Sequence, residues 1–376
     1  MQLYRQEASY LHALHRYADV LALVDTFLTR FARQPDSMMF YQMYRWRGYE
    51  YYLLGDLPAA VVAYNQALRY LPAREIRARV SRLTDLGAIY SRIQDYETAY
   101  QHYLQAYHLW EQIPSNDSLR LWARLDVLHG LASLLVAHPT TGHRSREAGL
   151  AEADRLIAEA RRLLPHVDIS RRLRARIELE LGLAEAAQRY LSGRPEQALQ
   201  ILDELLRRSR QLNEPHWRVE ILYRRGVAFW HAERLQEAEQ SFLEAQAHAD
   251  EALHDDTRRL VLTRLAQLYE DQERLDEAER FFRKAIPYTE TYLTRLQTTR
   301  WASLPTADWY EAYRGLVRVL LRQGRQAEAL QWLERSRARN LQAFRIYHAK
   351  TRQMPLHQQQ RRDSLVHALN QLRTRL

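Results

Sequence analysis

A pattern of small and aromatic residues recurs about every forty positions in this chain of 376 residues. Each copy begins with a small residue, and aromatic residues and alanines follow it at fixed spacings. Four complete copies are present: Gly48, Tyr51, Ala60, Tyr64 and Ala67; Gly87, Tyr90, Ala99, Tyr103 and Ala106; Gly226, Phe229, Ala238, Phe242 and Ala245; and Ala266, Tyr269, Ala278, Phe282 and Ala285. Repetition at a fixed interval predicts a solenoid, in which each unit buries its apolar face only against its neighbours.

Weaker copies extend the pattern towards both ends of the chain. They are Ala8, Leu11, Val20, Val24 and Phe27; Ala186, Ala198, Leu202 and Leu205; and Leu320, Ala329 and Leu333. An irregular unit at about 120–165 fills the remaining gap, with helices expected over 128–136 and 148–164 around a polar, turn-rich stretch at 138–143. Only 11 Gly and 11 Pro interrupt the chain. We therefore predict an all-α, right-handed solenoid of about eight antiparallel helix pairs.

The repeated small residue has a physical explanation. Two antiparallel helices approach closely only where a large side chain is absent, which places Gly48, Gly87 and Gly226 at helix crossings. Gly55 and Asp56 then provide the turn between two helices, because glycine and aspartate favour turns and helix starts.

The repeat resembles the tetratricopeptide repeat (TPR). The family pattern is similar to Tyr44-x₂-Arg47-Gly48-x₂-Tyr51, Ala60-x₃-Tyr64 and Pro72 in this chain. HEAT and armadillo repeats have a similar period, but their patterns do not explain the small, aromatic and alanine positions. The resemblance implies a concave groove, lined by the first helix of each pair, that binds a protein or peptide.

At the positions expected to face the groove, the first helices carry arginines and aromatic residues. These residue types dominate binding hot spots. The candidates are Arg45, Tyr49, Tyr52, Arg92, Tyr190, Tyr223, Trp230, His231, Arg314, Arg318 and Arg322. The aromatic residues could equally fill the core. The arginines at 314, 318 and 322 recur every four residues on one side of a helix. They form either a solvated face or a ridge that binds anions. The Lys and Asn residues of the TPR carboxylate clamp are missing, and Tyr49 stands where an Asn would be.

Composition narrows the function classes. The net charge is +9, but Lys284 and Lys350 are the only lysines, and the arginines are dispersed among acidic residues, as over 273–280. This dispersal argues against nucleic-acid binding. No apolar run approaches the length of a membrane span, and Met1–Glu7 does not resemble a signal peptide, so we expect a cytoplasmic protein without membrane contact.

Catalytic and cofactor motifs are not found either. The absence of cysteine rules out disulfides and a cysteine nucleophile within this chain. His12 and His15 have helical spacing without an evident third metal ligand, and no phosphate-binding loop or nucleophile elbow occurs. We therefore expect no enzymatic activity, metal or cofactor.

The end of the chain carries a more specific resemblance. Residues 329–341, ALQWLERSRARNL, resemble the helix that closes the TPR array of bacterial TPR–CHAT proteins, where a caspase-like peptidase follows. This resemblance implies an array over 1–345 and a helical linker or cap over 346–376. Trp332, Leu333 and Leu341 would pack the closing helix onto the array. The same resemblance implies a helix that docks a protease effector, with an apolar stripe made of Leu365, Leu369 and Leu372.

Two functions remain open at this point. The chain is either the regulatory or target-recruiting TPR part of a CHAT-type protease system, or a stand-alone TPR adaptor or peptide-sensing regulator. In both cases it is a non-catalytic scaffold for protein–protein interaction. A scaffold without a single dedicated ligand is a further alternative.

Overall fold

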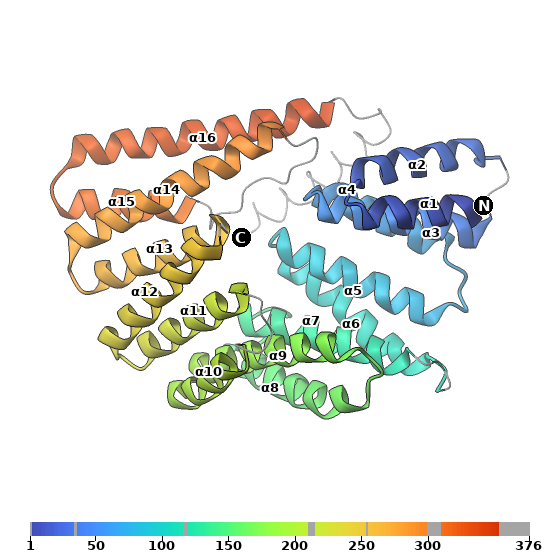
Figure 1. Ribbon diagram of the computed structural model, residues 1–376, viewed down its shortest axis with the longest axis horizontal. Helices are drawn as coiled ribbons and strands as arrows, with labels where there is room; N and C mark the ends of the chain where they lie inside the picture. Colours follow the sequence, from blue (N-terminus) through green and yellow to red (C-terminus); the bar gives the residue numbers. More distant parts are fainter. Residues whose placement is uncertain are drawn as a thin grey trace. The chain divides into compact units, whose positions relative to one another are not determined.

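The computed structural model describes residues 2–33, 36–115, 117, 119–209, 215–252, 255–298 and 310–352. Over these residues the chain forms sixteen α-helices, two short 3₁₀-helices and no strand (Figure 1). The α-helices follow one another as eight pairs, so the predicted all-α solenoid is confirmed. The chain divides into two compact units, one of residues up to Leu134 together with residues 346–352 at the end of the last helix, the other of the described residues from Leu135 to Arg345. We call them the N-terminal and the C-terminal unit and describe each by itself.

The N-terminal unit contains the first three helix pairs and most of a seventh α-helix. Its elements are α1 (Gln2–Ala13), α2 (Tyr17–Arg30), α3 (Ser37–Leu53), α4 (Leu57–Tyr70), α5 (Ile76–Arg92), α6 (Tyr96–Leu109), η1 (Trp110–Gln112) and α7 (Arg120–Ala137).

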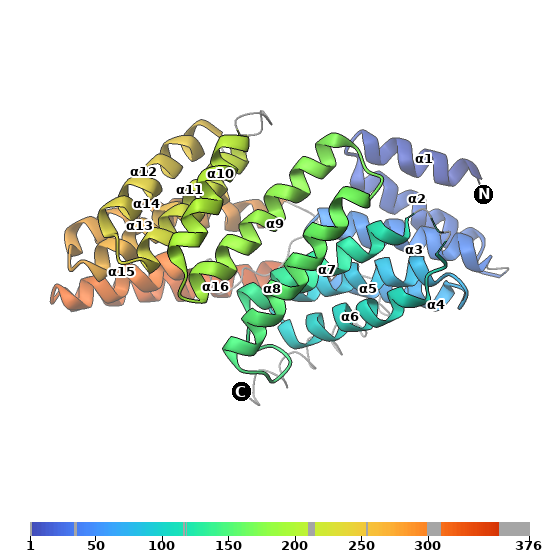
Figure 2. The same ribbon diagram turned by 90° about the horizontal axis from the view of Figure 1, so that it is seen from below.

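The C-terminal unit continues the succession of pairs (Figure 2). Its elements are α8 (Arg146–Leu163), η2 (Leu164–His166), α9 (Arg171–Leu191), α10 (Pro195–Ser209), α11 (Pro215–His231), α12 (Leu235–Ala252), α13 (Asp255–Asp271), α14 (Leu275–Thr298), α15 (Glu311–Arg322) and α16 (Gln326–Arg352) up to Arg345.

The predicted glycines do lie at helix crossings. A Cβ atom on Gly48 would be 2.6 Å from the ring of Tyr64, and one on Gly226 would be 2.6 Å from Phe242. Gly87 has the same relation to Tyr103, at 2.9 Å. In these three pairs the small residue of the first helix therefore receives the aromatic ring of the second helix.

The following repeat contributes a second small residue in two places, which the sequence pattern did not reveal. A Cβ on Gly130 of α7 would lie 2.4 Å from Tyr103, and one on Gly315 of α15 would lie 2.2 Å from Phe282. Tyr103 is thus held between two glycines of successive first helices. This contact explains how one repeat is packed against the next.

A common turn joins the helices of most pairs. A residue in the left-handed region precedes the second helix, such as Gly55 (φ 80°), Gln94 (φ 66°) and Glu273 (φ 59°). An aspartate caps α4 and α6: Asp56 accepts a hydrogen bond from the backbone N–H of Ala59 at 3.1 Å, and Asp95 accepts one from Thr98. The expected turn at Gly55 and Asp56 is confirmed.

The helices α10, α12, α14 and α16 have arginine at the equivalent cap position. Arg274 pairs with Glu277 of its own helix, as the helical spacing predicted, and with Glu239 of the preceding pair at 2.8 Å. Arg234 pairs in the same way with Glu237 and with Glu196. The dispersed arginines therefore connect successive repeats.

The irregular unit differs from its predicted boundaries. Its first helix was predicted over 128–136, but α7 begins at Arg120. The side chain of Asp117 accepts a hydrogen bond from the backbone N–H of Leu119 at 2.9 Å just before this start, a local turn signal missed in the sequence. Its second helix was predicted over 148–164, and α8 spans Arg146–Leu163 with η2 directly after it.

The closing helix α16 packs on the array through fewer residues than predicted. The ring of Trp332 lies 6.1 Å from that of Tyr313, between the guanidinium groups of Arg283 and Arg335. Leu333 and Leu341 are 36% and 52% exposed, so their predicted packing role is wrong. They lie on a side of α16 that no further repeat covers among the described residues. The predicted docking residues Leu365, Leu369 and Leu372 fall outside the described part of the chain.

Candidate ligand-binding faces on the first helices

A chain of tyrosine and arginine side chains connects first helices of the C-terminal unit. The hydroxyl of Tyr190 (α9) accepts a hydrogen bond from Nη1 of Arg224 (α11) at 3.4 Å. The hydroxyl of Tyr223 (α11) accepts one from Nε of Arg264 (α13) at 3.0 Å. We call these four residues the tyrosine–arginine ladder. Tyr190 and Tyr223 are only 5% and 6% exposed, so these two candidates hold arginines in place and offer little surface of their own.

The two ladder arginines are anchored by further polar groups. Nε of Arg224 donates to Glu220 at 2.8 Å, and Nη1 of Arg264 donates to Gln267 at 2.8 Å. Burial lowers the pKa of Arg224, but the nearby Glu220 and tyrosines outweigh it and raise this pKa above its usual value. The guanidinium groups are therefore charged and fixed in position.

The predicted arginine stripe on α15 is paired with carboxylates. Arg318 makes two hydrogen bonds to Glu270 of α13, at 3.0 and 3.1 Å, and Arg314 pairs with Glu311. Arg322 pairs with Glu273. An incoming anion would have to compete with these carboxylates. The pairing supports a structural role for the stripe, in which α15 is bound to α13.

Trp230 and His231 lie at the end of α11. The ring of His231 stacks on Tyr190 with centroids 4.9 Å apart, and Trp230 meets Phe242 edge-on at 6.4 Å. Burial and the nearby Arg146 lower the pKa of His231, which favours its neutral form. The structure thus brings Tyr190 and His231, two of the groove candidates, into contact.

The N-terminal unit holds the other four candidates. The guanidinium of Arg92 (α5) lies 4.9 Å from the ring centre of Tyr52 (α3), a cation–π contact between successive first helices. Tyr49 is 40% exposed, and its ring is 5.3 Å from that of His12. Arg45 lies over the ring of Trp46 at 5.1 Å. These side chains offer accessible aromatic and cationic surface.

The sequence did not single out Arg82, which lies on α5. A pocket of about 270 Å³ lies between α3 and α5, with Arg45 and Arg82 both in its wall. Its full lining is Met38, Tyr41, Gln42, Arg45, Glu75, Arg77, Ala78, Ser81 and Arg82. Arg82 was missed because the forty-residue pattern marks packing positions and carries no signal for it.

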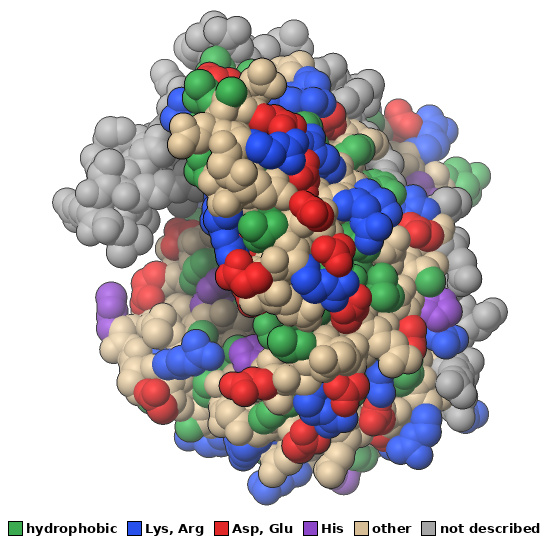
Figure 3. Space-filling model, turned by 90° about the vertical axis from the view of Figure 1, so that its left-hand side faces the viewer, with side chains coloured by type: hydrophobic (Ala, Val, Ile, Leu, Met, Phe, Trp, Pro, Cys, Tyr) green, Lys and Arg blue, Asp and Glu red, His purple; other side chains and the backbone are tan. Residues whose placement is uncertain are grey.

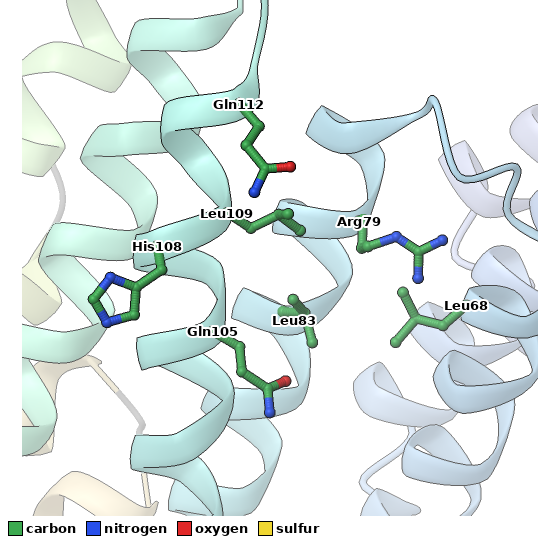
Figure 4. Close-up of a pocket in the computed structure, with 7 residues that line it drawn as sticks. All are labelled: Leu68, Arg79, Leu83, Gln105, His108, Leu109 and Gln112. Atoms are coloured by element: carbon green, nitrogen blue, oxygen red, sulfur yellow. The ribbon is translucent and has the colours of Figure 1, made fainter.

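A second pocket of about 440 Å³ involves none of the predicted candidates. In Figure 4 the leucines Leu68 (α4), Leu83 (α5) and Leu109 (α6) point towards its interior, and Arg79 stands at its edge. Its apolar lining contains residues of second helices, whereas the groove was predicted on first helices alone.

Charges of both signs interleave over the face of the molecule drawn in Figure 3. Among the described residues, no group of three or more His, Asp or Glu side chains could hold a metal ion. None of the described helices is both long and apolar enough to cross a membrane.

The comparison with known families agrees with the repeat geometry. Residues 217–291, which include α11, α12, α13 and part of α14, match the family model for the tetratricopeptide repeat. This segment carries tetratricopeptide repeats. Gly226 of this segment lies at a helix crossing, against the ring of Phe242. No match to the chain is found among curated proteins.

Solved structures with TPR folds resemble almost the whole chain. A Rap protein complexed with Competence and Sporulation Factor is 14% identical, with 93% of this chain and 97% of that chain covered and a TM-score of 0.55. The apo form of RapI is 10% identical, with the same coverage and a TM-score of 0.53.

A signal-transduction ATPase with a TPR sensor from Pyrococcus horikoshii is 13% identical, with a TM-score of 0.52. The alignment covers 90% of this chain but 52% of that protein, so this chain spans about half of its length. These likenesses show a shared TPR fold.

Proposed function

We propose that this chain is a non-catalytic TPR scaffold that binds a segment of a protein or a peptide along the faces of its first helices. The observation that carries the proposal is the accessible surface on α3 and α5, where Tyr49, Tyr52, Arg92 and Arg45 lie on consecutive first helices. Aromatic and arginine side chains concentrate binding energy at interfaces.

The fixed geometry of these faces favours binding. Side chains that are already held by neighbours lose less conformational freedom on association, which leaves more of the contact energy for affinity. The tyrosine–arginine ladder of the C-terminal unit is held in this way by Glu220 and Gln267. The likeness to a Rap protein that was solved in complex with Competence and Sporulation Factor supports a fold that can hold a ligand.

Peptides from a random twelve-residue display library, selected on the immobilised chain, would test this proposal. We expect Tyr49→Ala and Arg92→Ala each to weaken the selected peptides about tenfold, since each removes an exposed hot-spot side chain. Arg207→Ala is the matched control, because Arg207 is an exposed arginine on the second helix α10. Equal loss in the control, or no loss in the two variants, would contradict the proposal.

A more specific role, as the regulatory or target-recruiting part of a CHAT-type protease system, rests on the resemblance of residues 329–341. In that case Leu365, Leu369 and Leu372 would dock a protease effector. Deletion of residues 353–376 should then abolish binding to a purified CHAT-type peptidase and leave peptide binding by the first helices unchanged. Retained peptidase binding would remove the docking role and favour a stand-alone adaptor or peptide-sensing regulator.

A further inference from the structure

The pocket between α3 and α5 combines positive charge with hydrogen-bond donors. Arg45 enters it from α3 and Arg82 from α5, and Gln42 and Ser81 add an amide and a hydroxyl. The ring of Tyr41, which is 4% exposed, lies in the wall. A cavity of about 270 Å³ has room for one side chain or one chain end.

Among the described residues, the acidic groups near this pocket leave one guanidinium without an ion pair. Arg77 pairs with Asp117 at 2.9 Å, Arg82 with Asp85 at 2.5 Å and Arg74 with Glu75 at 3.7 Å. Arg45 forms no ion pair with any described residue, and its Nε donates to the neutral amide of Gln42 at 3.3 Å. The pocket therefore carries an excess of positive charge.

The two arginines line the same pocket and are partly shielded from water. Burial is the main cause that lowers the pKa of Arg45, and the positive charge of Arg82 lowers it further. The nearby Asp85 raises this pKa, but its influence is too weak to restore the usual value. Nε of Arg82 is buried without a hydrogen-bond partner among the described residues, and its guanidinium lies over the ring of Tyr64 at 5.0 Å. A second negative group would stabilise Arg45, which has no ion pair, and would share Arg82 with Asp85, since opposite charges interact strongly where water is scarce.

We propose that Arg45 and Arg82 bind one carboxylate of the ligand segment in this pocket, supplied by an acidic side chain or by a chain end. This inference rests on the proposed function, of which it defines one subsite. Planar guanidinium groups match the geometry of a carboxylate, with parallel N–H donors for its two oxygens. The amide of Gln42 and the hydroxyl of Ser81 can donate further hydrogen bonds.

Three small probes separate the two sources of the carboxylate. N-acetylglutamate α-amide carries only a side-chain carboxylate, N-acetylalanine carries only a terminal one, and N-acetylglutamine amide carries none. Titration of the full chain would be followed through the NMR signal of the Arg45 Nε–H group. We expect saturable shifts with at least one of the two acids and no saturable shift with the neutral amide.

Two variants and one control assign the site. Arg45→Gln should weaken the acid about tenfold, as expected for loss of a charge-assisted hydrogen bond. For this variant, binding is followed through other signals of the pocket. The double variant Arg82→Gln/Asp85→Asn should have a similar effect, because it removes the second guanidinium without leaving a buried carboxylate unpaired. Arg79→Gln is the control, since Arg79 lies on the same helix and lines the other pocket.

Equal binding of the neutral amide, or unchanged binding of the acid to both variants, would overturn the inference. The outcome is independent of the display selection. Selected peptides that bind the first helices without any acidic group would uphold the proposed function and refute the carboxylate subsite. Carboxylate binding at Arg45 without any selected peptide would uphold the carboxylate subsite and refute the proposed function.

Discussion

Replacement of Gly149 by alanine is expected to lower the free energy of unfolding of the C-terminal unit by about 3 kcal/mol, the upper range for overpacking. A Cβ at this position of α8 would lie 1.8 Å from the carbonyl oxygen of Pro139 and 2.6 Å from its carbonyl carbon. Both are backbone atoms, so no rotation of a side chain can relieve the overlap.

The loop that contains Pro139 is itself held in place. The backbone N–H and the hydroxyl of Thr141 both donate to the carbonyl oxygen of His138, at 3.2 and 2.8 Å. The loop can therefore move away from an alanine only if these hydrogen bonds are disturbed. Urea unfolding followed by circular dichroism measures the effect. Ala148→Ser is the control, because Ala148 is the exposed neighbour on the same helix. A stability of Gly149→Ala within about 0.5 kcal/mol of the control would contradict this packing.

Replacement of Asp56 by asparagine is expected to stabilise the chain at pH 8 and to have little benefit at pH 4. Asp56 caps α4 and is 5% exposed, and its burial raises the pKa of its carboxyl to about 6. The ordinary value for the unfolded chain is 3.8. The folded state thus binds the proton more tightly than the unfolded state does. The stabilisation by this group is complete below pH 3.8 and is lost as the pH rises through 6.

The size of this effect follows from the difference between the two pKa values. A shift of about two units corresponds to about 3 kcal/mol of stability lost between pH 4 and pH 8. Asparagine can accept the same hydrogen bond from Ala59 and carries no charge, and it caps helices as well as aspartate does. The advantage of Asp56→Asn over the unchanged chain should therefore grow between pH 4 and pH 7.

The control for this prediction is Asp95→Asn in the next repeat. Asp95 accepts the equivalent cap hydrogen bond from Thr98 at 3.1 Å, but it is only partly buried. Urea midpoints measured from pH 4 to pH 8 compare the two variants. A constant difference between Asp56→Asn and the unchanged chain over this range would show that Asp56 is not protonated in the folded state.

The sequence predicts the packing of this protein better than it predicts the polar faces. Gly48, Gly87 and Gly226 stand out because a crossing between two helices tolerates only small residues, and the same requirement returns in each repeat. The turn at Gly55 and Asp56 is likewise specified by adjacent residues. Such constraints act within one helix pair and therefore leave a periodic signal.

The polar contacts between repeats leave no such signal. Tyr223 has the spacing of a groove residue, yet it is buried because Arg264 of the next first helix covers its hydroxyl. Arg318 has the spacing of an exposed stripe, yet Glu270 neutralises it from another helix. Helical periodicity defines which side of a helix faces inward. It does not define how far a long polar side chain reaches into the neighbouring repeat.

Photochemical cross-linking of a selected peptide would test the central claim most directly. A benzophenone amino acid placed at each peptide position in turn would be activated on the bound complex, and mass spectrometry would locate the attachment sites. The proposed function predicts attachment to first helices, above all to α3 and α5 around Tyr49 and Arg92. Attachment mainly to the second helices, such as α4, α6, α10 or α12, would contradict it.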